Sequence, residues 1–488
     1  MLIRLDNLLY AVQPRATRQV VHIPPSWVDR QIGPVVVDSR EVTPGSLFVA
    51  LTGERTDGHL YLPDVVERGA AAALVSPAKL AALAPDWSAV ARPWRLIEPS
   101  DGSALATVPP EACLFIAVDD PLCALQRAAV YHRRMFTPTV IGITGSVGKT
   151  STKEVVAAVI SQRLRTLKSQ RSFNSDITLP ATLLGLTADH QVAVLEMGMW
   201  AAGEIRFLAA LARPHIGIVT NVGPSHLERL GSIEAIANAK AELPESLPPD
   251  GWCILNADDP RVAAMAKRTP AHVVTYGFAP HADVRAVEVI SHGLYGIELT
   301  VSYQGEQHHL QTPLIGRHHA YTTLAAIAAA LVVGLDWEAI AAGLRDPGER
   351  LRLRVVNGQQ GVTIIDDTYN AAPLSTIAAL EVLAETPGRR IAVLGEMLEL
   401  GSATEEGHRQ VGAAAARTAD LLVAVGRQAQ TVAAAARAAG MAEAQVIVCA
   451  DNDAAIDRLR SLIQAGDCLL VKGSRGVQME TIVTALQG

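Results

Sequence analysis

Short apolar runs alternate with helical patterns along most of this chain. Runs suited to buried strands occupy residues 140–143, 191–195, 215–220 and 252–255, and helical spacing separates each run from the next. This alternation predicts an α/β domain built on a mostly parallel sheet. Because ligands bind beyond the carboxyl ends of parallel strands, we expect the polar residues that follow these runs to meet in one crevice.

Five further strand-helix steps follow residue 350 and predict a second, Rossmann-like sheet. Their apolar segments are VTIIDD, RIAVLGEM, ADLLVAVG, QVIVCAD and DCLLVKGS. No G-x-G-x-x-G turn follows the first of them, so dinucleotide binding is not indicated. A substrate-binding or lid domain is the better interpretation.

The first 120 residues contain short strand and turn signals and a helical segment from Leu62 to Gly69, which predict a small α/β unit. The proline-rich stretch from Pro85 to Pro110 has no clear period, so we expect an irregular loop there. A helix over Leu122–Met135 then leads to Pro138, a suitable domain boundary. We therefore expect three domains, over residues 1–138, 139–346 and 347–488.

Composition and charge narrow the class of protein. At 488 residues the chain is longer than one core supports, and 4% aromatic residues suit layers packed with small side chains. The net charge of −7 is spread without a basic block, so neither nucleic acid nor an anionic membrane is an expected partner. The start of the chain lacks a signal-peptide pattern, and the apolar run Leu324–Val333 is too short to span a bilayer. We expect a cytoplasmic protein.

Cysteine usage agrees with a reducing compartment. The five cysteines are an odd number and include no C-x-x-C pair, so neither a disulfide framework nor a zinc site is indicated. The sequence does not determine the oligomeric state, and a monomer is our working expectation.

The segment VIGITGSVGKTS, residues 140–151, has the pattern of a phosphate-binding loop. Gly145 and Gly148 permit a tight turn after a buried strand, and helical spacing follows. Backbone N–H groups at such a helix start favour polyphosphate, while Lys149 can meet the outer phosphates and Thr150 can hold magnesium. An enzyme that uses ATP or GTP is the working interpretation.

The loop alone does not establish this function. The strict P-loop spacing would place its first glycine at position 143, where Ile143 stands. The alternative is a glycine-rich turn between strand and helix whose lysine is merely solvated.

Other polar residues follow the predicted strands of the middle part. Glu196 ends a strand and can hold the magnesium that bridges phosphate oxygens, or it can be a solvated carboxylate. His226 lies in a turn beyond another strand and is a second candidate cation ligand, although a lone histidine is more often structural. Lys240 lies on an alanine-rich helix, where exposure to solvent is its default interpretation.

Two clusters end strands of the last predicted domain. Asp366 and Asp367 close VTIIDD, where paired acids seldom serve packing and can contact a ribose, a cation or an amine. Lys472, Ser474 and Arg475 follow another strand and suit a carboxylate or phosphate. The alternative for both clusters is a salt-bridged turn.

Several long motifs in order resemble the Mur ligases over nearly the whole chain. They are DSREVTPGSLFVAL, GITGSVGKTS, FNSDITLPATLLGL, EMGMWAAGEI, TNVGPSHLERLGSIEAIANAKAEL, DDTYNAAPLS, LGEMLELG and VKGSR. The FNSDITLP and EMGM-x-x-GEI stretches look like the branch that joins D-alanyl-D-alanine to a UDP-N-acetylmuramoyl-tripeptide. The family's loop is GT-x-GKT-like, which accounts for the unusual spacing at Ile143.

The resemblance implies an ATP- and Mg²⁺-dependent amide ligase with a UDP-sugar-binding domain, a central ATPase domain and a C-terminal domain that brings the incoming amine. It implies catalytic roles for Lys149, Lys240 and His226. It implies ATP binding by Gly145, Ser146, Val147, Gly148, Lys149, Thr150, Ser151, Asn256, Arg352 and Asp367. It implies metal binding by Thr150, Glu196, His226 and a carbamylated Lys240, and substrate binding by Asp38, Ser39, Arg40, Asn370, Lys472, Ser474 and Arg475.

This chain departs from the family pattern at three of the positions compared. His319 and Thr322 stand where asparagines are usual after GRH, and Ala372 replaces a common asparagine in DDTYNAAPLS. Two alternatives therefore stay open: a Mur-type ligase for another amino component, and a P-loop protein that uses nucleotide hydrolysis as a switch. The switch has no need of the family's second-metal lysine, so Lys240 argues against it.

Overall fold

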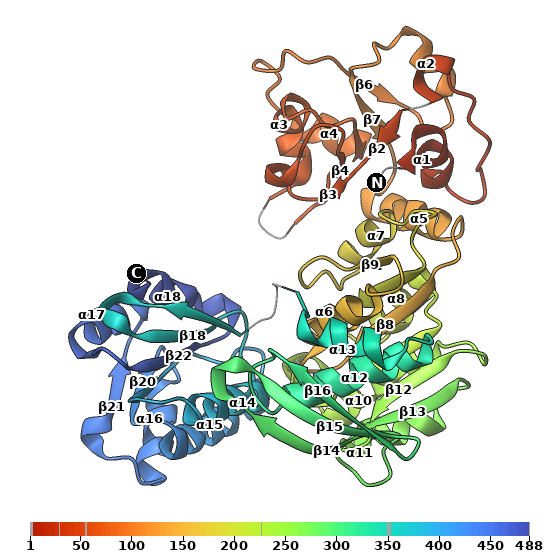
Figure 1. Ribbon diagram of the computed structural model, residues 1–488. Helices are drawn as coiled ribbons and strands as arrows, with labels where there is room; N and C mark the ends of the chain where they lie inside the picture. The colour runs from red at the N-terminus through yellow and green to blue at the C-terminus, as the bar shows by residue number, and fades with distance from the viewer. Residues whose placement is uncertain (1–2, 29, 54–55, 226, 349–352, 488) are drawn as a thin grey trace. The chain divides into compact units, whose positions relative to one another are not determined.

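The computed structural model describes residues 3–28, 30–53, 56–225, 227–348 and 353–487 (Figure 1). The chain forms two compact units. The first comprises Met1–Val140, Arg165–Met197 and Phe207–Pro214, and the second comprises Ile141–Leu164, Gly198–Arg206 and His215–Gly488. Both units are built from strands and helices, which confirms the predicted α/β class.

A five-stranded parallel sheet forms the centre of the first unit. Its strand order is β3-β4-β5-β7-β6. The strands are β3 (Val35–Val36), β4 (Leu47–Val49), β5 (Ala72–Val75), β7 (Cys113–Ala117) and β6 (Trp94–Ile97). Two further pairs are β1 (Ile3–Arg4) with β2 (Gln31–Ile32), antiparallel, and β9 (Thr166–Lys168) with β10 (Val192–Glu196), parallel.

Helices of the first unit pack around these strands. They are α1 (Leu5–Val12), α2 (Pro25–Val28), α3 (Leu62–Glu67), α4 (Pro77–Leu83), α5 (Pro121–Arg133) and α7 (Thr178–Leu183), with 3-10 turns η1 (Ser39–Glu41), η2 (Gly58–Tyr61) and η3 (Gly102–Thr107). The helices predicted from Leu62 and from Leu122 are thus confirmed as α3 and α5. Helix α8 (Glu204–Ala212) crosses the boundary between the units along the chain.

The expectation of an irregular loop from Pro85 to Pro110 is wrong, because the segment contains strand β6 and turn η3. The first three residues of β6 are exposed, so the strand lacks the apolar run or alternation that would have predicted it. Its pairing depends on tertiary contacts instead. The Trp94 ring stacks 4.9 Å from Phe115 and 4.4 Å from Trp87, between ring centroids.

The second unit contains the strand that precedes the glycine-rich loop. Its first sheet runs β16-β15-β14-β13-β12-β11-β8. The neighbouring pairs from β8 to β14 are parallel, and β15 and β16 extend the sheet in antiparallel fashion. The strands are β8 (Thr139–Thr144), β11 (Ile216–Val219), β12 (Trp252–Asn256), β13 (His272–Gly277), β14 (Val284–Ser291), β15 (Ile297–Tyr303) and β16 (Glu306–Thr312).

The predicted strands of this region are confirmed, but the antiparallel extension was missed. Strand β16 reads EQHHLQT and is mostly exposed, so its sequence contains no apolar run to reveal it. The helices here are α6 (Lys149–Ile160), α9 (Leu227–Leu230), α10 (Ile233–Glu245), α11 (Pro260–Ala263), α12 (His319–Val332) and α13 (Trp337–Arg345), with η4 (Ala264–Lys267) and η5 (Gly293–Tyr295). Helices α12 and α13 pack against α6.

A six-stranded sheet forms the rest of the second unit, in the order β17-β18-β22-β19-β20-β21. Its strands are β17 (Arg354–Asn357), β18 (Thr363–Asp367), β19 (Arg390–Leu394), β20 (Leu421–Val425), β21 (Val446–Cys449) and β22 (Cys468–Lys472). The helices are α14 (Pro373–Ala384), α15 (Thr404–Thr418), α16 (Ala429–Ala438), α17 (Asn452–Leu462) and α18 (Glu480–Leu486), with η6 (Gln359–Gly361), η7 (Gly401–Ala403), η8 (Glu443–Gln445) and η9 (Arg475–Val477).

The apolar runs of this last sheet are buried on both faces. Ile364 and Leu469 belong to one hydrophobic cluster, while their chain neighbours Ile365 and Leu470 belong to the other. Strands covered on both faces read as continuous apolar segments, which is why all five predicted strand-helix steps are confirmed.

No helix in the described ranges combines the length and apolar character that a membrane span requires.

Candidate active site

The glycine-rich loop connects strand β8 to helix α6, as predicted. Gly145 has φ +149° and Gly148, at the start of α6, has φ +86°. A Cβ atom at Gly145 would lie 1.9 Å from Thr220 Oγ1, so a side chain there would collide with strand β11. Around Gly148 no atom lies within 4 Å of such a Cβ, and only the backbone conformation favours glycine.

The end of strand β11 holds this loop in place through side chains. Asn221 Oδ1 accepts from Val147 N at 2.9 Å, and Asn221 Nδ2 donates to Val147 O at 2.9 Å. Thr220 Oγ1 also donates to Val147 O, at 2.7 Å. Ser146 N donates to Asn221 O, and Ser146 Oγ bonds the Gly223 backbone. Thr220, Asn221 and Gly223, in the turn that follows β11, therefore determine the loop's shape before any ligand binds.

Lys149 and the hydroxyl residues after it begin helix α6. Lys149 Nζ donates to Gly145 O at 2.7 Å and to Ser146 O at 3.3 Å, so the cation lies over the loop. Thr150 and Ser151 are buried in the first helical turn. A positive side chain beside a helix N-terminus attracts phosphate, and a hydroxyl at this place is a hard oxygen ligand of the kind magnesium prefers.

Lys240 is fully buried on helix α10, contrary to the default expectation of a solvated side chain. It is 1% exposed, and within the described ranges its amine makes no hydrogen bond or ion pair. Burial, and secondarily the nearby charge of Lys149, lower the pKa of Lys240 well below its ordinary value. A neutral, desolvated amine is the form that reacts with carbon dioxide, and a carbamate would give this buried position a negative charge.

Of the other predicted metal ligands, Glu196 is described in the first unit, and His226 lies outside the described residues. Glu196 is buried at the end of β10, where its Oε1 accepts from Asn174 Nδ2 at 2.8 Å. Asn174 belongs to the FNSDITLP stretch, which gives that motif a function in orienting the carboxylate. No group of three or more His, Cys, Asp and Glu side chains suited to a metal occurs in the described parts of the chain.

Asn256 is the last residue of strand β12 and supports the site through hydrogen bonds to neighbouring backbone. Its Nδ2 donates to Thr220 O at 3.0 Å, and its Oδ1 accepts from Asp258 N. Asp259 completes the support by accepting from Val222 N at 2.7 Å. These contacts give Asn256 a structural function, while nucleotide contact by its side chain stays a prediction.

Two of the three residues that depart from the family pattern, His319 and Thr322, pair with each other. His319 Nδ1 lies 3.4 Å from Thr322 Oγ1, one helical turn along α12, and both side chains are buried. Burial, and then the neighbouring His318, lower the pKa of His319 well below its ordinary value. A neutral imidazole and a hydroxyl thus replace the two amides expected from the resemblance.

The predicted residues of the last sheet meet at the adjoining ends of β18 and β22. Lys472 Nζ donates to Asp367 Oδ2 at 2.6 Å and to Asn370 O at 2.9 Å. Ser474 Oγ accepts from Leu398 N at 2.9 Å, and the Arg475 guanidinium lies 5.3 Å from the ring centroid of Tyr369. Lys472 and Ser474 therefore hold this corner together. Arg352 lies outside the described residues.

The DSR segment of the first unit forms a tight exposed turn. Asp38 accepts from Arg40 N and from its guanidinium, with Asp38 Oδ2 2.6 Å from Arg40 Nη2. These hydrogen bonds hold the pKa of Asp38 below its usual value. Ser39 begins the 3-10 turn, and the Arg40 side chain is 84% exposed. The turn presents backbone and arginine groups to solvent, and binding of the UDP-sugar there stays a prediction.

Thr220 and Asp259 are site residues that the sequence did not reveal, and Asn221, expected only as a polar residue at a strand end, is a third. Thr220 and Asn221 directly follow the apolar run at 216–219, so their place at a strand end was visible. What the sequence could not show is that these side chains bond the neighbouring loop rather than a ligand.

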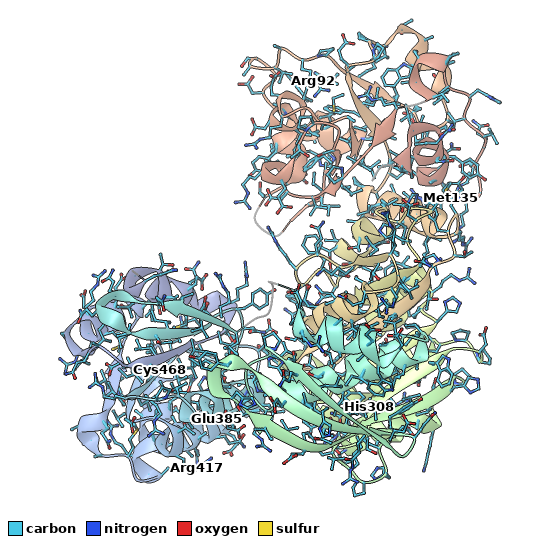
Figure 2. The ribbon with its side chains drawn as sticks, in the orientation of Figure 1. Arg92, Met135, His308, Glu385, Arg417 and Cys468 are labelled. Carbon is cyan, nitrogen blue, oxygen red and sulfur yellow. The ribbon has the colours of Figure 1, made fainter. Side chains whose placement is uncertain are left out.

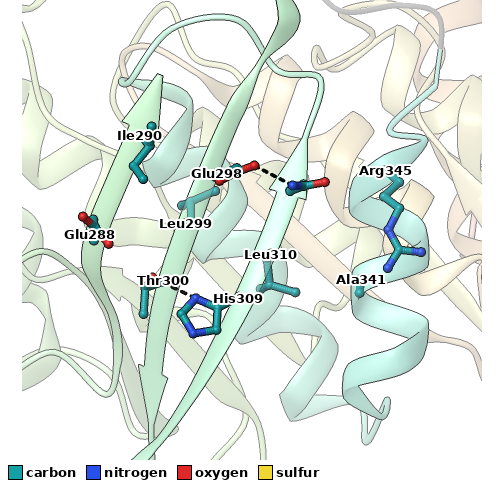
Figure 3. Close-up of a pocket in the computed structure, with 10 residues that line it drawn as sticks. Glu288, Ile290, Glu298, Leu299, Thr300, His309, Leu310, Ala341 and Arg345 are labelled. Atoms are coloured by element: carbon teal, nitrogen blue, oxygen red, sulfur yellow. Dashed lines mark hydrogen bonds between the residues drawn. The ribbon is translucent and has the colours of Figure 1, made fainter. Parts of the chain in front are cut away.

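A separate pocket of about 220 Å³ lies between strands β14, β15 and β16 and helix α13 (Figure 3). In it Gln311 Nε2 donates to Glu298 Oε1, and Thr300 Oγ1 lies 3.1 Å from His309 Nδ1. Glu288 and Glu298 also line it. Two carboxylates disfavour phosphate, and no predicted site residue lines this pocket.

A buried parallel strand, a glycine turn and a helix that starts with lysine define a phosphate-binding α/β protein of the nucleotide-dependent class. Family models match three stretches of the chain: "Mur ligase family, catalytic domain" at residues 31–94, "Mur ligase middle domain" at 143–330 and "Mur ligase, glutamate ligase domain" at 351–475.

Similar proteins agree with these matches. The chain is 37% identical to the UDP-N-acetylmuramoyl-tripeptide--D-alanyl-D-alanine ligase of Synechocystis sp., over 94% of this chain and 92% of that one. The crystal structure of MurF from Acinetobacter baumannii has a TM-score of 0.79 at 27% identity, covering 99% of this chain and 98% of that one. MurF ligase from Thermotoga maritima in complex with ADP shares the fold, with a TM-score of 0.72 at 23% identity over 92% of this chain and 96% of that one.

This chain belongs to the Mur ligase family, and the resemblance inferred from its motifs is confirmed. Its α/β fold comprises the family's three domains.

Proposed function

We propose that this protein is an ATP-dependent amide ligase that joins D-alanyl-D-alanine to a UDP-N-acetylmuramoyl-tripeptide in peptidoglycan precursor synthesis. Family membership supports ligase chemistry, and the name of the Synechocystis relative supports this pair of substrates. The ADP complex of the Thermotoga ligase supports ATP as the energy source. The five cysteines are free, which suits the reducing cytoplasm that we propose as its location.

The reaction must convert an unreactive carboxylate into an electrophile. Transfer of the γ-phosphoryl group from ATP to the tripeptide carboxylate gives an acyl phosphate and ADP. The free amine of D-alanyl-D-alanine then attacks the carbonyl carbon, loses a proton and expels inorganic phosphate. We assign Lys149 and the N–H groups at the start of α6 to hold the transferring phosphates and offset the repulsion between the two anions.

Several residues present here suit a magnesium site. The proposed ligands are Thr150, Glu196, His226 and a carbamylated Lys240. Magnesium held there would supply positive charge that offsets the charge of the phosphates.

The observation that carries the proposal is the buried Lys240, whose amine has no hydrogen bond or ion pair among the described residues. An uncompensated buried amine costs stability and has no value to a protein that only hydrolyses nucleotide as a switch. A carbamate there gives the amine a purpose, because it supplies a carboxylate-like ligand in a site that must hold phosphates and metal.

The direct test measures ADP release by the purified protein with ATP, magnesium and UDP-N-acetylmuramoyl-tripeptide, with and without D-alanyl-D-alanine. We expect release that depends on both substrates and an amide product in the mass spectrum. Release indifferent to both would instead identify a switch, and release with another amine would identify a different ligase.

A second test isolates Lys240. After exchange into ¹³C-bicarbonate buffer, we expect a carbamate carbon signal that disappears in Lys240→Ala and persists in the control Lys267→Ala, which removes an exposed lysine. Lys240→Ala should also abolish product formation. Full activity in Lys240→Ala would contradict the assignment.

A further inference from the structure

The first unit contains a hollow that no part of the proposed ligase machinery uses. Its volume is about 330 Å³, and it is lined by the chain after α1, by one face of α5 and by α8. Four of its described lining residues are arginines and none is acidic: Arg15, Arg18, Arg127 and Arg134. Cations gathered in one hollow repel each other, so this arrangement costs free energy unless an anion occupies it.

Two of these arginines are held in place by the last turn of α1. Arg18 Nη2 donates to Ala11 O at 2.8 Å and to Gln13 O at 3.2 Å. Arg127 Nε donates to Val12 O at 3.0 Å. The carbonyls at a helix C-terminus attract cations, so this turn positions both guanidinium groups without neutralising them with a carboxylate.

Several N–H groups of the four arginine side chains are not used by these contacts. Arg18 Nε is buried and has no hydrogen-bond partner. The terminal amino groups of Arg127 make no hydrogen bond within the described ranges, and the side chains of Arg15 and Arg134 make none there either. Contacts or positions at helix C-termini account for the charges of Arg18, Arg127 and Arg134, but no such reason accounts for Arg15.

The hollow is also lined by apolar and aromatic side chains. They include Tyr131, Phe207 and Leu211, and Phe207 is 40% exposed. The Tyr131 ring packs 5.2 Å from that of Tyr10, which fixes its orientation. Met135, just beyond α5, is also exposed at 48% (Figure 2). A ligand for this hollow thus needs both negative charge and an apolar or ring-shaped part.

We propose that this hollow is a binding site for a small organic phosphate, separate from the catalytic site. A phosphate carries close to two negative charges and accepts from several guanidinium groups at once, which one carboxylate does less well. Its organic part lies against Tyr131 and Phe207. The concave shape and the volume favour a small molecule over a flat lipid surface.

Cys123 provides a readout confined to this site. It lines the hollow and is the exposed one of the five cysteines, while the other four are buried. A bound phosphate slows alkylation of Cys123 by covering the sulfur and by adding negative charge beside the thiolate. The test measures the rate of N-ethylmaleimide addition to Cys123 in the full chain, by mass spectrometry, with increasing phenyl phosphate at constant ionic strength.

We expect phenyl phosphate to slow the alkylation at least five-fold and to saturate, and phenol to have no effect. In the double variant Arg15→Gln/Arg134→Gln, half-protection should need at least ten times more phenyl phosphate. That variant removes no hydrogen bond of the described structure, so its folding is preserved, and circular dichroism checks this. Arg95→Gln, which removes an exposed arginine of the same unit, is the matched control and should behave as the wild type.

Three outcomes would overturn the proposal. One is no protection by phenyl phosphate, and another is protection that persists in the double variant. The third is protection by phosphatidylglycerol vesicles without protection by phenyl phosphate, which would identify a membrane surface as the occupant. None of these outcomes depends on ligase activity, so failure here is distinguishable from failure of the proposed function.

Discussion

Lys472 Nζ lies 2.6 Å from Asp367 Oδ2, across the adjacent parallel strands β22 and β18. The Lys472 side chain is 2% exposed and that of Asp367 13%, so each charge depends on the other. Removing one partner leaves a desolvated charge, which costs about 3–5 kcal/mol, whereas removing both costs less. We expect Lys472→Met and Asp367→Asn each to lower the free energy of unfolding by about 3 kcal/mol.

The double variant Lys472→Met/Asp367→Asn should be less destabilised than the sum of the two single variants. Urea unfolding of all four proteins gives the coupling energy directly. Additive effects would mean that the two charges act independently, contrary to the geometry.

Gly145 and Gly148 should respond differently to the same substitution. Gly145→Ala places a Cβ 1.9 Å from Thr220 Oγ1, so the loop must shift, and we expect the KM for ATP to rise more than ten-fold. Gly148→Ala meets no atom within 4 Å and costs only the left-handed conformation, about 1–2 kcal/mol.

The double variant Gly145→Ala/Thr220→Ala removes the colliding hydroxyl and should recover part of the ATP affinity. Steady-state ADP release measures all three variants. Equal effects of the two glycine substitutions would contradict the steric argument.

Lys149→Met tests whether the cation over the loop serves phosphate transfer. Loss of one charged group that faces developing negative charge typically lowers the rate by about 10²–10³-fold. We expect ADP release to fall by that factor, with little change in the urea midpoint, because solvent can also satisfy the Gly145 and Ser146 carbonyls that Lys149 bonds. A large loss of stability with an unchanged rate would assign Lys149 a structural function instead.

His408 should make the last domain sensitive to acid. Its Nε2 accepts from Met397 N at 3.0 Å and its Nδ1 donates to Thr404 O at 2.7 Å, so the buried ring is neutral. Burial lowers the pKa of His408 below 6.5. The unfolded chain therefore binds more protons in the window just below pH 6.5, and stability falls as the pH drops through that window, by at most about 1.4 kcal/mol per pH unit.

His408→Gln keeps a donor and an acceptor but cannot titrate. We expect the difference in unfolding free energy between pH 7.5 and pH 5 to be smaller in this variant than in the wild type. Urea titrations at the two pH values measure it, and an unchanged difference would exclude His408 as a source of the acid sensitivity.

Much of the fold was predictable because its central strands are apolar along their whole length. Ile364 and Ile365 are buried on opposite faces of one sheet. Consecutive residues of such a strand are therefore apolar, and this apolar run predicts the strand. Strands β6 and β16 escaped prediction because their side chains are largely exposed and their pairing depends on distant partners.

The candidate site was predictable in its types of residue but not in their contacts. Local glycine spacing predicts the phosphate loop. The hydrogen bonds that hold Val147 to Asn221, in contrast, join residues 74 positions apart in the sequence. Burial of Lys240 was also invisible, since an alanine-rich helix gives no sign of which face is covered. Lys472 looked like a ligand-binding cation, yet its charge is engaged by Asp367.

Strand β22 lies between β18 and β19 at the middle of its sheet, although it is the last strand in chain order. Until it is added, the β17-β18 hairpin and the β19-β20-β21 layer have no hydrogen bonds to each other. During synthesis, this domain therefore cannot complete its sheet until β22, residues 468–472, has left the ribosome. Ribosome-bound chains that stop before residue 468 should expose both apolar edges, which makes this the stage at which chaperones are most needed.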